Sequence, residues 1–353
     1  PVGISFYTFQ TLSYTIDVYR GNITAERHLG RFALFVSFFP QLVAGPIERA
    51  SRFLPQIELE KRFDRERVFS GLQLLMWGLF KKVVIADRLA IYVDQVYGNV
   101  GSHDATAYLL ATYAFAFQIY CDFSGYTDMA LGSAKVLGFD LMKNFKRPYF
   151  ATSIQEFWRR WHISLSTWLR DYLYISIGGN RKGLPRTYAN LLITMLIGGL
   201  WHGAAWNFVV WGAVHGLLLS GSRYTSPWRD SLYANFHVPG WLRDGLRMLI
   251  TFHLVCFAWV FFRAASTSDA FQILSGLGGN WGAIQADRSL LAPAVLGVVL
   301  LLLVQMGQAR WGSFREKIRT WPAPIRWAVW YTLALLIYMF GAGPGQRFIY
   351  FQL

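Results

Sequence analysis

The sequence predicts an all-α polytopic membrane protein, and three observations carry that prediction. The chain of 353 residues is 54% hydrophobic and only 15% charged, whereas soluble domains are about 25% charged. Several apolar runs approach the ~20 residues that a helix needs to cross a bilayer. The Lys and Arg residues, which give a net charge of +14, gather in the loops between those runs.

Six apolar runs are the candidate crossings. They are Phe69–Ile85, Ala105–Tyr120, Leu191–Leu219, Leu246–Phe262, Leu290–Met306 and Trp327–Gly341. The loops 48–67 and 143–186 are rich in Lys and Arg, but the loop 98–104 between the first two runs has neither. The positive-inside rule therefore places the two basic loops in the cytoplasm and loop 98–104 outside. This topology accounts for the positive charge, and no nucleic-acid-binding motif accompanies it.

One segment, Thr187–Gly221, is too long for a single crossing. Its 35 residues would form a helix of about 52 Å, against a hydrocarbon core of ~30 Å. The loops on both sides are basic, which predicts that the segment enters and leaves on the same side. We expect the helix to break at Gly198-Gly199 or at Gly203, where protein or a cavity must shelter the open backbone.

Two histidines are the leading candidates for chemistry. His202 lies inside this long segment, and His162 lies forty positions upstream. An ionisable group within a bilayer is costly and is by default a functional-site candidate. His215 would lie ~220° from His202 on a continuous helix, so either the backbone breaks between them or only one belongs to the site. The alternative is helix packing with hydrogen-bonded histidines, because small residues recur four apart around them.

The stretch Pro148–Gly179 is too polar to span a bilayer and too aromatic for an ordinary loop. It predicts an interfacial or re-entrant amphipathic helix. On such a helix one polar stripe would hold Gln155, Arg159, His162, Ser166 and Arg170. The stripe either lines an aqueous cavity with His162 at its deep end or is the solvated face of a surface helix.

Other polar residues are weaker candidates. Asp122 and Asp128 lie near the inner half of a crossing, and Trp201 and Asn207 flank the predicted break. These residues could line a polar path or a donor tunnel, or could instead be caps and hydrogen-bonded contacts between helices. The same alternatives apply to a helical face formed by Gln10, Tyr14 and Asp17. We expect no metal site, because the seven histidines form neither HxxxH nor HExxH.

Motifs that run in order along the whole chain carry a family resemblance. They are residues 1–10, Gln41–Ile47, Asp122–Asp128, Glu156–Ser166 with its continuation to Arg181, Gly198–Trp206, Trp259–Arg263 and residues 348–352. With these motifs the chain resembles the membrane-bound O-acyltransferase (MBOAT) family, and within it the bacterial alginate O-acetyltransferase branch.

The resemblance implies a fold and a site. The fold is a ring of tilted transmembrane helices with re-entrant or interfacial helices around a central tunnel. Residues 1–353 would form a single membrane domain that lacks an N-terminal portion of roughly a hundred residues. By this resemblance His202, in the Trp-His-Gly motif, is the catalytic residue, and His162 matches a second polar residue of the site.

The implied reaction moves an acetyl group from a cytoplasmic thioester, acetyl-CoA, across the bacterial inner membrane. The acetyl group would reach an extracytoplasmic polysaccharide such as alginate, with a periplasmic acetyltransferase as outer-face partner. We expect no bound cofactor and no nucleic acid. Our hypothesis is that His202 accepts the proton of the acceptor hydroxyl, a role worth ~10²–10⁴-fold in rate. His162 would orient the thioester or stabilise its oxyanion.

Alternatives remain open at the level of sequence. The acceptor could be cellulose or peptidoglycan, or the reaction could be D-alanyl transfer to teichoic acid from a carrier-protein thioester. A different class is a proton-coupled transporter in which His162 and His202 relay protons. Transporters often contain inverted repeats, and none is evident in this sequence.

Overall fold

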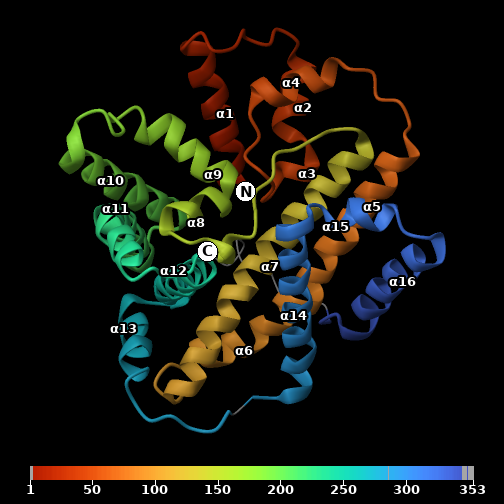
Figure 1. Ribbon diagram of the computed structural model, residues 1–353. Coiled ribbons are helices and arrows are strands. Elements are labelled where there is room, and N and C mark those ends of the chain that lie inside the picture. The colour runs from red at the N-terminus through yellow and green to blue at the C-terminus, as the bar shows by residue number, and fades with distance from the viewer. Residues whose placement is uncertain (1–2, 285, 344–347, 349–353) are drawn as a thin grey trace. The chain divides into compact units, whose positions relative to one another are not determined.

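The computed structural model describes residues 3–284, 286–343 and 348. Every regular element in this part of the chain is a helix, which confirms the predicted all-α fold (Figure 1). The chain divides into two compact units. The first unit comprises Pro1–Tyr92, Phe117–Lys143 and Ala286–Gln352, and the second comprises Val93–Ala116 and Asn144–Gln285. The single membrane domain expected from the sequence stays a prediction.

The first unit contains most of the N-terminal and C-terminal helices. They are α1 (Ile4–Tyr19), α2 (Leu29–Ser37), α3 (Phe39–Leu42), α4 (Ala50–Glu58), α5 (Arg65–Phe80), the π-helix η1 (Lys81–Ala86), the start of α6 (Asp87–Tyr97), the later part of α7 (Ala105–Leu137), α14 (Arg288–Trp311), α15 (Phe314–Arg319) and α16 (Ala323–Phe340). A cluster of buried rings that includes Phe35, Phe38 and Phe53 packs between α2 and α4.

Within this unit α5 and α7 pack backbone against backbone. A Cβ added at Gly71 would lie 2.7 Å from the carbonyl oxygen of Gly132, and one at Gly78 would lie 2.5 Å from that of Gly125. Membrane helices approach closely where both present small residues. These glycines therefore fix how the two helices cross.

The second unit contains the segments that carry the predicted histidines. They are the first part of α7, the short helices η2 (Pro148–Phe150), α8 (Ile154–Arg160), α9 (Ile163–Trp168) and η3 (Leu169–Tyr174), and then α10 (Gly183–His202), α11 (Trp206–Asn235), α12 (Gly240–Arg263) and α13 (Thr267–Gly276). Figure 1 shows α10 and α11 lying side by side as a hairpin.

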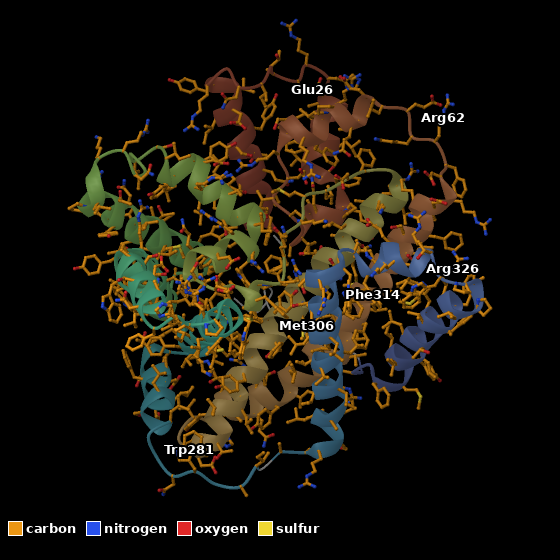
Figure 2. The ribbon with its side chains drawn as sticks, in the orientation of Figure 1. Glu26, Arg62, Trp281, Met306, Phe314 and Arg326 are labelled. Carbon is orange, nitrogen blue, oxygen red and sulfur yellow. The ribbon has the colours of Figure 1, made fainter. Side chains whose placement is uncertain are left out.

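Among the described residues, four helical stretches are long and apolar enough to cross a membrane. They are Arg65–Tyr97, Gly240–Arg263, Arg288–Trp311 and Ala323–Phe340. They contain the cores of four predicted crossings, which confirms those runs as candidate spans. The predicted run Ala105–Tyr120 instead begins the 33-residue helix α7, which is not one of the four. Apolar side chains on α14, including Met306 in Figure 2, are exposed as a lipid-facing helix requires.

The long segment breaks as the sequence predicted. Helix α10 ends at His202 and α11 begins at Trp206, so the break falls at Gly203 and not at Gly198-Gly199. Glycines also make the hairpin tight, because a Cβ at Gly199 would overlap the carbonyl group of Phe208. Gly199 therefore serves close helix packing, as the alternative interpretation of the small residues expected, and the predicted break is present as well.

The stretch Pro148–Gly179 differs from its prediction. It is not one amphipathic helix, because the chain turns between α8 and α9, where His162 adopts φ 41° and ψ 55°. The polar stripe predicted on a continuous helix is therefore wrong. Gln155, Arg159 and Arg170 are exposed, whereas His162 is buried.

Candidate active site

His202 is the last residue of α10, and aromatic rings surround it. Its ring centroid lies 4.8 Å from that of Trp201, 5.1 Å from Trp211 and 5.0 Å from Phe262. The first ring comes from α10 itself, the second from α11 and the third from α12. Because α10 ends at this residue, the imidazole lies beside the non-helical backbone that follows and among packed aromatic side chains.

His162 lies at the turn between α8 and α9 and is only 1% exposed. Its ring centroid lies 6.2 Å from that of Trp201, the same indole that contacts His202. The structure therefore brings three predicted site residues together, with Trp201 beside both histidines. His162 thus does not lie on a solvated stripe but is a buried residue at the start of α9.

Short-range hydrogen bonds explain why α8 begins and holds where it does. Ser153 Oγ accepts from the backbone N–H of Glu156 at 3.1 Å, which is an N-cap. Glu156 in turn accepts from the backbone N–H of Thr152 at 2.7 Å and pairs with Arg160 at 2.5 Å. Burial raises the pKa of Glu156, but the bonds from Thr152 and Arg160 outweigh it and leave that pKa below its usual value.

His215 on α11 joins the same aromatic cluster. It is fully buried, its ring stacks on Phe157 at 6.2 Å, and Trp158 Nε1–H donates to its Nδ1 at 3.3 Å. An indole N–H can only donate, so this bond assigns the neutral tautomer with the proton on Nε2. Trp211 lies next to both His215, at 4.9 Å, and His202. The backbone does break between the two histidines, and one indole contacts both.

Two further candidates hold the local structure together. Asn207 Nδ2 donates to the carbonyl oxygen of Ala264 at 3.0 Å and so ties the start of α11 to the end of α12. Ser166 Oγ donates to the carbonyl oxygen of Trp161 at 3.0 Å. These hydrogen bonds favour a structural role for both side chains.

Asp122 and Asp128 belong to the first unit, where lysines of η1 pair with them. Lys82 Nζ lies 2.6 Å from Asp122 and 2.7 Å from Asp87, and Lys81 Nζ lies 2.8 Å from Asp128. A paired carboxylate fits the alternative of contacts between helices better than a donor-lining role.

The N-terminal polar face is also hydrogen-bonded locally. The Tyr14 hydroxyl accepts from the backbone N–H of Glu26 at 2.9 Å, and Asp17 accepts from Asn22 at 3.2 Å. Gln10 is buried. For Tyr14 and Asp17 these contacts favour the structural alternative.

The aromatic surroundings of the histidines were not predicted. Trp211, Trp259 and Phe262 are each at most 3% exposed, and they come from helices whose pairing the sequence does not give. The high density of Trp and Phe in the family motifs was the one sequence feature that could have indicated an aromatic site. In such low-dielectric surroundings a neutral imidazole is tolerated without an opposite charge beside it.

Comparison with known proteins identifies the family. Residues 25–267, which include His162 and His202, match the membrane-bound O-acyltransferase family. The probable alginate O-acetylase AlgI of Pseudomonas putida is 40% identical, covering 100% of this chain and 75% of the relative. That of Pseudomonas aeruginosa is 44% identical, covering 85% of this chain and 56% of the relative.

A peptidoglycan O-acetyltransferase of Helicobacter pylori is 39% identical, over 79% of this chain and 57% of that relative. The chain thus spans less than two thirds of the length of two of these three relatives. The matches confirm the resemblance drawn from the motifs, including its alginate O-acetylase branch. The chain therefore belongs to the membrane-bound O-acyltransferase family.

Proposed function

We propose that the protein is a membrane O-acetyltransferase that moves an acetyl group from cytoplasmic acetyl-CoA to an extracytoplasmic polysaccharide such as alginate. Family membership and the named activities of the relatives support this proposal. The observation that carries the assignment of the site is the position of Trp201 beside both His162 and His202.

The proposed chemistry uses His202 as a general base. A hydroxyl is a poor nucleophile at neutral pH, so a positioned imidazole that takes its proton accelerates attack. The hydroxyl oxygen forms a bond to the thioester carbonyl carbon, the carbon–sulfur bond breaks, and the leaving thiolate takes the proton from His202. His162 would hold the carbonyl oxygen, where negative charge develops during the attack.

The surroundings of this site are part of the same proposal. A single membrane domain would place the site in a tunnel through a ring of tilted helices in the bacterial inner membrane. A periplasmic acetyltransferase partner would pass the acetyl group to the polymer. The basic loop 143–186, which the charge pattern places in the cytoplasm, would lie on the side where the thioester enters.

Transfer of labelled acetyl from acetyl-CoA tests the proposal. The full-length protein and its genomic neighbours are expressed in membranes as wild type, His202→Ala and His253→Gln. His253 is a matched control because its ring is exposed and bonded to Tyr113 at 2.8 Å. Label should enter an extracytoplasmic polymer with wild type and the control, and fall by at least ~10²-fold with His202→Ala.

Each of three other results would contradict one part of the proposed function. Normal transfer by His202→Ala would show that His202 is not the general base. No transfer by wild type would argue against acetyl-CoA as donor, and proton-driven uptake without transfer would favour a transporter.

The identity of the labelled polymer decides the acceptor. The Helicobacter pylori relative acts, by its name, on peptidoglycan, so label in peptidoglycan instead of a soluble polysaccharide would select that acceptor.

A further inference from the structure

We propose that Asn144 is a positioning residue that holds His162 in the orientation the reaction needs. The inference rests on the proposed role of His162 and adds a residue that no local sequence pattern singles out. Asn144 lies eighteen positions before His162 and is fully buried. Every contact used here lies within the second unit.

The backbone of His162 is in a conformation that it would not adopt unaided. Its φ of 41° and ψ of 55° lie in the left-handed region, which a residue with a Cβ enters at a cost. Such a conformation persists only where the surrounding structure determines it. The turn also starts a new helix, and the first backbone N–H groups of a helix have no partner within it.

Asn144 supplies partners for the first two of those groups. Its carbonyl oxygen accepts from the N–H of Ile163 at 2.9 Å, and its side-chain Oδ1 accepts from the N–H of Ser164 at 3.1 Å. These are the two residues that directly follow His162. One asparagine therefore holds the start of α9 from both its backbone and its side chain.

A second contact holds the other side of the turn. The N–H of Lys146 donates to the carbonyl oxygen of Arg160, the last residue of α8, at 2.9 Å. Residues 144–146 thus bridge the end of α8 and the start of α9, with Trp161 and His162 between the two attachments. This bridge fixes the direction in which the His162 Cα–Cβ bond leaves the chain, and with it the approach to Trp201.

Loss of the side-chain acceptor should therefore act through His162. Asn144→Ala keeps the backbone bond to Ile163 but leaves the buried N–H of Ser164 without its acceptor. Asn144→Asp keeps an oxygen acceptor at the same side-chain length, and a carboxyl group buried without an opposite charge takes up a proton and stays neutral. Small misplacements at a reacting site can cost up to ~10²-fold in rate.

The experiment measures acetyl transfer by the full-length protein with its partner, normalised to folded protein. We expect Asn144→Ala to lower kcat by about 10- to 10²-fold with little change in KM for acetyl-CoA. Asn144→Asp should restore most of the rate. Asn190→Ala is the matched control, because Asn190 is equally buried and donates to the carbonyl oxygen of Gly179 at 2.8 Å.

A double-mutant cycle separates positioning from general stability. On a His162→Asn background, which is chosen to retain a measurable rate, Asn144→Ala should cost little more, because residues that act as a unit are not additive. A full additional loss, an equal loss in Asn190→Ala, or a normal rate in Asn144→Ala would each overturn the inference.

Amide hydrogen exchange tests the same contact without any activity. Exchange at Ile163–Ser164 in the purified protein should speed up in Asn144→Ala but not in Asn144→Asp. Unchanged exchange would overturn the proposed contact even in an active enzyme. If the wild type transfers no acetyl group, the proposed function fails, and exchange alone still decides whether Asn144 holds this turn.

Discussion

The two units of the molecule bury polar groups in opposite ways. In the first unit Lys81 and Lys82 pair with carboxylates at 2.6–2.8 Å. In the second unit His162, His202 and His215 lie among Trp and Phe rings. A buried charge is stable only with an opposite charge beside it, whereas a neutral imidazole tolerates apolar neighbours. The first arrangement therefore holds charged groups in ion pairs, and the second holds neutral imidazoles.

The lysines of both ion pairs belong to the π-helix η1. Neighbouring residues of a regular helix point ~100° apart, yet Lys81 and Lys82 both reach carboxylates on α7. Their partners, Asp128 and Asp122, lie six positions apart. The lysines follow Gly78, where the backbone of α5 meets that of α7 at Gly125. The close crossing therefore brings both ammonium groups near the same helix.

The largest effect on stability is expected from breaking one of these pairs. Lys82→Met leaves Asp122 and Asp87 without their shared ammonium group, and removal of one partner of a buried pair costs about 3–5 kcal/mol. Thermal unfolding of the purified protein in detergent should show a large loss of stability.

Arg62→Met is the control for that experiment, because Arg62 is exposed and pairs with the exposed Glu60. The double variant Lys82→Met with Asp122→Asn should recover part of the stability. Wild-type stability in Lys82→Met would contradict the structural role assigned to the first unit.

A smaller effect is expected at His215, which packs among the rings of the second unit and also accepts a hydrogen bond from Trp158. His215→Phe keeps the ring that packs on Phe157 and Trp211 but removes the acceptor for the Trp158 N–H. An unsatisfied buried donor costs about 1–3 kcal/mol, so thermal unfolding should shift moderately and transfer should fall only in part. A complete loss of transfer at wild-type stability would instead place His215 among the reacting groups, and His253→Phe serves as the control.

The sequence predicts those features of the fold that depend on the composition and length of a single segment. Apolar runs located four candidate spans, and length with flanking charge predicted a break, which falls at Gly203 beside His202. The left-handed turn at His162 was missed because its determinants include Asn144, eighteen positions away. Likewise, nothing local to Lys82 indicates Asp122, forty positions further on. Both missed features depend on polar contacts between residues far apart in the sequence, which helical periodicity does not indicate.

The smallest effect is expected on the exposed face of α8, where the predicted stripe proved wrong. Gln155 and Arg159 are exposed, and exposed side chains away from special contacts usually change stability by no more than about 0.5 kcal/mol. Arg159→Ala should therefore transfer acetyl at a rate within about 2-fold of wild type. If Arg159→Ala instead raises KM for acetyl-CoA relative to wild type, and high salt abolishes that difference, Arg159 would be assigned to the phosphates of the donor. In that case exposure on α8 would mark an entrance for substrate, and the contrast between the units would lie in access as well as in charge.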